Sequence, residues 1–140
     1  MPRIFRQSPL NAIWEGSGNV ICLDVLRAAT KDPNSLKAVL VELELARGTE
    51  PRYDAYLDGQ VLPALAELQS GGVHTARLAV GRVAVALQAS LLLRHGDADA
   101  AAVFCGSRLG SAGRSEYGAL DGSLSAAAAG LVARTTPVAA

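Results

Sequence analysis

The most apolar segment of the chain, Val73 to Arg94, restricts the possible folds most strongly. It contains the run RLAVGRVAVALQASLLLR, which places apolar residues on nearly every side of a helix. Such a helix is stable only where other elements cover it on several sides, as at the centre of a bundle. The alternating valines would also suit a strand, but the length, the alanines and the leucine-rich end favour a helix.

Shorter amphipathic patterns predict further helices around this one. Half of the residues are hydrophobic and only 4% are aromatic, and the abundance of alanine favours closely packed helices over a β-sandwich. Gly59 and Pro63 should weaken or bend the helix that contains them. We therefore predict an all-α fold, an antiparallel bundle of four or five helices. The further helices of the bundle are expected from Ser17 or Asn19 to about residue 31 and over residues 35–47, 49–69 and 97–109, and residues 123–134 are expected to form an alanine-rich terminal helix.

The first 15 residues form the least regular part of the sequence. Pro2 and Pro9 disfavour a helix, and Trp14 is costly to leave in water. We predict an extended N-terminal arm over residues 1–15 that needs a partner surface. Residues 16–140 form the predicted helical domain, and its last residues are expected to fray.

Composition and charge exclude several classes of protein. The formal net charge is zero, which is unlike a polybasic protein. Cys22 and Cys105 form no CxxC motif, and His74 and His95 have no acidic or thiol companions at ligand spacing, so we predict buried reduced thiols and no metal site.

The location of the protein is predicted from the same sequence. The first residues, MPRIFRQSPL, lack the apolar core of a signal peptide, and the apolar run 83–93 is too short to cross a bilayer. We therefore expect a cytoplasmic protein without a membrane anchor.

The stretch IWEGSGN contains the most reactive candidate residue, Glu15. An acid flanked by Ile13 and Trp14 would be poorly solvated when charged, which raises the pKa of its carboxyl group and makes it a stronger base. Alternatively, Glu15 stabilises the start of the following helix by about 0.3–1 kcal/mol through the helix dipole. The residues alone favour the second interpretation.

The longer stretch IWEGSGNVICLDVLRA resembles a motif of the acyl-CoA dehydrogenases, Ile-(Tyr/Trp)-Glu-Gly-(Thr/Ser), found in their C-terminal helical domain. The tryptophan and the continuation CLDVLRA are most similar to the alkylation-response, AidB-like branch. The segments ALQASLLLRHGDADAAAVFCGSRLG and RSEYGAL resemble the final helices and tail of that branch.

This resemblance implies a specific chemistry. Glu15 would remove the α-proton of an acyl-CoA thioester, with FAD accepting the β-hydrogen as hydride. Trp14 would line the acyl pocket, and Gly16, Ser17 and Asn19 would lie near flavin or substrate. Family members are usually homotetramers assembled through their helical domains.

The family's N-terminal helical domain and β-domain have no counterpart in this sequence. We therefore expect a C-terminal fragment or split subunit of a flavoprotein, inactive by itself.

The same branch is associated with binding of duplex DNA. Arg27 and Arg108 match the pattern of the branch and are the candidate phosphate contacts. The alternative for Arg27 is an ion pair with Asp24 one helical turn earlier. The zero net charge favours that alternative, because nucleic-acid binding depends on excess positive charge.

Overall fold

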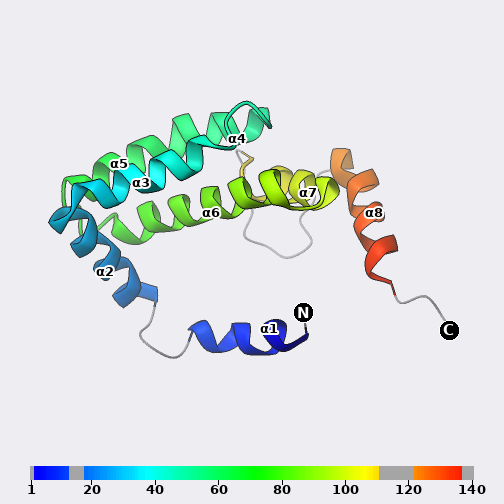
Figure 1. The fold of residues 1–140 in the computed structure, drawn as a ribbon, viewed down its shortest axis with the longest axis horizontal. Coiled ribbons are helices and arrows are strands. Elements are labelled where there is room, and N and C mark those ends of the chain that lie inside the picture. The colour runs from blue at the N-terminus through cyan, green and yellow to red at the C-terminus, as the bar shows by residue number, and fades with distance from the viewer. Residues whose placement is uncertain (1, 13–17, 111–121, 137–140) are drawn as a thin grey trace.

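The computed structural model describes residues 2–12, 18–110 and 122–136 (Figure 1). These described ranges are helical and contain no strand, so the all-α prediction is confirmed. The helices are α1 (Pro2–Gln7), α2 (Gly18–Lys31), α3 (Pro33–Glu44), α4 (Pro51–Tyr56), α5 (Leu62–Gln69), α6 (Ala76–His95), α7 (Ala98–Arg108) and α8 (Ser125–Thr135). Two 3-10 turns, η1 (Ser8–Ala12) and η3 (Gly122–Leu124), and one π-helical turn, η2 (Leu57–Val61), complete the described elements.

Helix α6 occupies the centre of the bundle, as its apolar sequence predicts. It contacts α2, α3, α4, η2, α5 and α7, and Figure 1 shows α3 and α5 running alongside it. Its fully buried positions carry small side chains, which let neighbouring helices approach closely. These residues are Ala76, Ala79, Ala86, Ala89 and Ser90.

Helix α6 (Ala76–His95) is longer than the apolar run 83–93 that it contains. With 20 residues and a mean hydropathy of 1.5, it is the one helix in the described ranges long and apolar enough to cross a membrane. The central helix of a bundle meets the same two criteria. Within the fold, 28% of the most apolar 18-residue stretch of α6 is buried, and Leu78 and Leu91 are exposed.

The largest fully buried apolar side chains come mainly from the consecutive elements α3, α4, η2 and α5. At the edge of this part of the core, Arg94 of α6 is paired with Glu42 of α3 at 2.5 Å. This region therefore combines an apolar centre with an ion pair at its edge. The buried side chains are Leu43, Tyr53, Leu57, Val61 and Leu68.

Helix α3 begins two residues earlier than its apolar pattern indicates. Pro33 is its first residue, where a proline fits because the first N–H of a helix has no partner within the helix. Asp32 caps the helix: its carboxylate accepts a hydrogen bond of 3.0 Å from the Asn34 N–H.

The helix predicted over residues 49–69 is present but interrupted, as Gly59 and Pro63 predict. Pro51 is the first residue of α4, and the π-helical turn η2 separates α4 from α5. In this turn the Leu62 N–H donates to the Leu57 carbonyl, five residues back. Pro63 has no N–H to continue the regular α-helical ladder, so the wider turn accommodates it.

The prediction of an extended N-terminal arm is wrong, because residues 2–7 form helix α1. Pro2 occupies the first helical position, where it is tolerated, and Pro9 lies in the following 3-10 turn. The side chains of Ile4, Phe5 and Leu10 are 66%, 79% and 53% exposed. The segment is therefore helical, yet its apolar side chains are not packed in a core.

Candidate functional site

Four of the predicted site residues, Trp14, Glu15, Gly16 and Ser17, lie outside the described residues. Helix α2 begins immediately after them at Gly18, which agrees with a helix start between Ser17 and Asn19. The described part of the site is therefore the first turn of α2 and the residues that contact this turn.

An arginine from a distant helix contacts this first turn. The guanidinium of Arg77, in the first turn of α6, donates a hydrogen bond to the Asn19 side-chain Oδ1. The same guanidinium lies beside Gly18, where an added Cβ would be 3.7 Å from Nη1. Arg77 thus connects the start of α2 to the start of α6.

The sequence patterns did not predict a role for Arg77. It is 58 residues from Asn19, and no local pattern relates the two positions. A contact of this kind follows only from the way α2 packs on α6.

The first two turns of α2 also carry apolar side chains in solvent. Val20, Ile21 and Leu23 are 48%, 45% and 43% exposed, whereas Leu26 and Ala29 further along the helix are buried. The C-terminal half of α2 is therefore anchored in the core, and its N-terminal half, next to the predicted base, is largely uncovered.

The two arginines proposed for DNA differ in their surroundings. Arg27 is 76% exposed and forms the expected ion pair with Asp24, at 2.9 Å. Arg108 is exposed in the last turn of α7. Figure 1 shows α2 at one end of the bundle and α7 nearer the middle, beside α6.

The sulfur and imidazole groups form no obvious reactive centre. Burial raises the pKa of the Cys105 thiol to about 11, which keeps it protonated and unreactive near neutral pH. Cys22 is half-buried on α2. Among the residues that the structure describes, no three His, Cys, Asp or Glu side chains are grouped to hold a metal ion.

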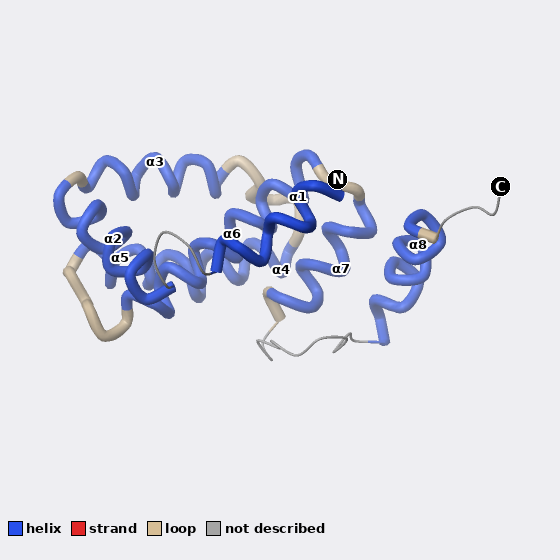
Figure 2. The backbone as a smooth tube through the Cα atoms, turned by 90° about the horizontal axis from the view of Figure 1, so that it is seen from below, coloured by secondary structure: helices blue, strands red, loops and turns tan. Residues whose placement is uncertain are grey.

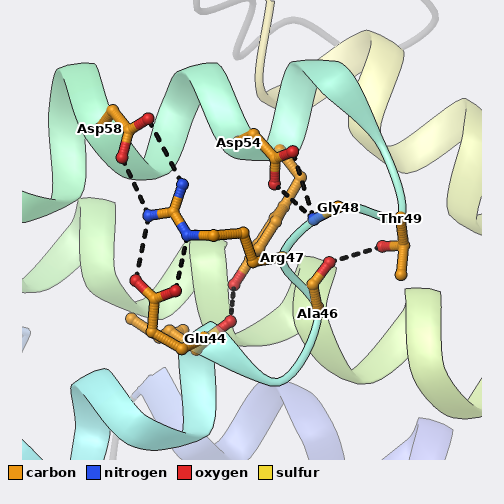
Figure 3. Close-up of polar contacts among 9 residues, drawn as sticks. Glu44, Ala46, Arg47, Gly48, Thr49, Asp54 and Asp58 are labelled. Atoms are coloured by element: carbon orange, nitrogen blue, oxygen red, sulfur yellow. Dashed lines mark hydrogen bonds and ion pairs between the residues drawn. The ribbon is translucent and has the colours of Figure 1, made fainter.

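The most extensive polar cluster surrounds Arg47 in the turn between α3 and α4 (Figure 3). Its Nε lies 2.6 Å from Glu44 Oε2, and its Nη2 lies 2.9 Å from Asp58 Oδ1. Beside it, the Gly48 N–H donates to Asp54 Oδ1 at 3.0 Å, with Gly48 at a φ of 82°. Glycine adopts this left-handed conformation at no steric cost, which allows the sharp reversal.

The electrostatics of this cluster indicate a structural role. Hydrogen bonds from Arg47 lower the pKa of both Glu44 and Asp58, so both carboxylates stay ionised and paired. A general acid or base needs a pKa near the working pH, and neither carboxylate meets that requirement. The cluster therefore ties the α3–α4 turn to α4 and η2 through the hydrogen bonds of Arg47 and Gly48.

Comparison with known proteins gives one partial match. The chain is 61% identical over 31 residues to the "Putative acyl-CoA dehydrogenase AidB" of Escherichia coli (strain K12). That similarity is local. It spans 22% of this chain and 6% of the relative's length. No family model matches the chain, and no solved structure matches it.

Proposed function

We propose that this chain provides the helical, base-carrying part of an acyl-CoA dehydrogenase-like flavoprotein, and that it is inactive by itself. The observation that carries the proposal is the local identity of 61% to a putative acyl-CoA dehydrogenase. The all-α architecture supports it, as does a helix that begins at Gly18, directly after the Ile-Trp-Glu-Gly-Ser segment.

Glu15 is the proposed base. Its carboxylate would take the α-proton of an acyl-CoA thioester, a reaction that requires a carboxyl group with a raised pKa. Trp14 would form part of the wall of the acyl pocket. Asn19, four residues after Glu15, and Arg77 of α6 would hold the start of α2 against α6 and so fix the direction in which the preceding segment enters the helix.

The described residues do not fit a complete flavin site. The Oδ1 of Asn19, the one predicted flavin or substrate contact within the described ranges, already accepts a hydrogen bond from Arg77. The neighbouring Val20 and Ile21 are exposed side chains on the surface of a helix. FAD, which would accept hydride in such a reaction, therefore needs walls from another domain or subunit.

The first experiment tests the isolated chain. The purified 140-residue protein is titrated with FAD while flavin fluorescence is followed, and octanoyl-CoA is then added anaerobically. We expect neither stoichiometric FAD binding nor bleaching of the flavin absorbance. Stoichiometric binding with substrate-dependent bleaching would contradict the proposal that the chain needs a further domain.

The second experiment tests the role of Glu15. In a chimaera that joins this chain to the flavin-binding part of an acyl-CoA dehydrogenase, Glu15→Gln should slow flavin reduction by about 10²–10⁴-fold while FAD stays bound. Asp24→Asn, which changes an exposed carboxylate on the same helix, is the matched control and should leave the rate unchanged. Equal rates for Glu15→Gln and the unmodified chimaera would remove Glu15 from the mechanism.

Binding of duplex DNA is the alternative function, supported by the exposure of Arg27 and Arg108. It is tested by titrating a fluorescent 20-base-pair duplex with the chain at 20 mM and 200 mM salt. Phosphate contacts would give an affinity that falls steeply with salt. Absence of binding at 20 mM salt would exclude this alternative.

A further inference from the structure

Helix α8 is attached to the fold in a different way from the central helices. Its main contacts are with α7 and with η3, and none of its residues is fully buried. Figures 1 and 2 show it at one end of the molecule, beyond α7. Apolar burial, which holds α3 to α6 together, therefore contributes little to the position of α8.

The polar attachment of α8 is concentrated in one side chain. The Nη2 of Arg134 lies 2.6 Å from Asp97 Oδ1 and 2.8 Å from Asp99 Oδ2. Asp97 also caps α7, because its Oδ1 accepts hydrogen bonds from the N–H groups of Asp99 and Ala100. A single guanidinium near the end of α8 is thus bound to both carboxylates at the start of α7.

Two glycines permit the close approach of these segments. A Cβ on Gly130 of α8 would lie 2.6 Å from Asp99 Oδ2, and a Cβ on Gly106 of α7 would lie 2.5 Å from a methyl carbon of Leu124. Leu124, in η3 directly before α8, is 5% exposed and is the one fully buried apolar side chain in η3 and α8. The contact therefore includes one buried apolar side chain, two close approaches at glycines and the ion pairs of Arg134, beside half-buried α8 residues such as Leu131.

We propose that α8 is a releasable strap, docked on α7 by Arg134 and set free when that ion pair is weakened. The ion pair is open to solvent, since the side chains of Arg134, Asp97 and Asp99 are 48%, 49% and 38% exposed. Salt screens such pairs, because the Debye length falls from about 10 Å at 0.1 M to about 3 Å at 1 M. Released from α7, α8 frays as a short isolated helix and uncovers the surface of α7 beside Asp99.

The proposal is tested by hydrogen–deuterium exchange of the full 140-residue chain at 50 mM and 1 M sodium chloride. We expect amide exchange in residues 126–135 to become about tenfold faster at high salt, while exchange in α5 and α6 stays slow. Equal exchange of α8 at the two salt concentrations would overturn the proposal. So would a parallel loss of protection in α6, because α8 would then unfold only together with the core.

Two variants separate docking from helix formation. Arg134→Ala should give fast exchange in α8 already at 50 mM salt, whereas Arg27→Ala, which removes an exposed arginine paired within its own helix, should leave α8 unchanged. Gly130→Ala should also speed exchange, although alanine is the better helix former, because its Cβ displaces the Asp99 carboxylate. Slower exchange in Gly130→Ala, or wild-type exchange in Arg134→Ala, would overturn the proposal.

Discussion

The centre and the two ends of this molecule contain similar apolar residues, but these residues differ in how far they are buried. Leu43, Tyr53 and Leu57 are completely buried in the centre, whereas Phe5 near the N-terminus and Val132 in α8 are 79% and 64% exposed. Each central helix contacts several others, and α1 and α8 have their main contacts with the elements next to them in the chain. Stability therefore resides in the centre, and the positions of the two ends are free to depend on partners or on solution conditions.

The largest effect should come from opening the centre. Leu43→Ala removes a side chain that is 0% exposed, and the lost burial plus the remaining cavity should lower the free energy of unfolding by about 2–5 kcal/mol. Urea denaturation followed by circular dichroism measures the change. Leu45→Ala is the matched control: Leu45 is 54% exposed, so a change of at most about 0.5 kcal/mol is expected. Equal destabilisation by both variants would refute the division between centre and surface.

A smaller effect is expected at alkaline pH, and it also originates in the centre. Burial raises the pKa of Cys105 to about 11 and raises the pKa of Tyr53 and Tyr56. In each case the folded state holds its proton more tightly than the unfolded chain. Their contribution to stability is therefore complete below about pH 9 and is lost as the pH rises towards 11.

Thermal melts between pH 7 and 11 test this dependence. The melting temperature should stay level up to about pH 9 and then fall. Cys105→Ala should reduce the steepness of that fall, and Cys22→Ala, a change at the half-buried thiol, serves as the control. A melting temperature that rises with pH in this range would contradict the assigned sign.

The smallest of these effects concerns one hydrogen bond. The Tyr53 hydroxyl donates to the Leu43 carbonyl at 2.8 Å inside the core, and Tyr53→Phe should lower the free energy of unfolding by about 1 kcal/mol. Tyr56→Phe should change it less, because the Tyr56 hydroxyl has no hydrogen bond within the described part of the chain. A larger loss for Tyr56→Phe would indicate that the hydrogen bond at Tyr53 does not stabilise the core.

Local patterns in the sequence predicted the features that depend on neighbours along the chain. The apolar run predicted the central helix α6, and Gly59 and Pro63 predicted the interrupted helix. The N-terminal helix was missed because Pro2 was taken as a helix breaker, although it fits the first position of a helix.

Contacts between distant residues could not be predicted in this way. The pairs Arg77–Asn19 and Arg134–Asp97 are separated by 58 and 37 residues, and their formation depends on how the helices pack. Hydrophobic periodicity fixes which face of a helix is buried, but it does not fix which helix covers that face. The proposed role of Glu15 had a different origin, since it rests on the resemblance of its motif and not on periodicity.

The π-helical turn η2 has a consequence for how this chain could change in length. One extra residue in a helix rotates everything after it by about 100°. Helix α4, before the turn, contacts α6 and α7, whereas α5, after it, contacts α6 and α2. A deletion of one residue within Leu57–Val61 would remove that rotation and turn the apolar side of α5 away from α2, so this segment should tolerate substitutions far better than deletions.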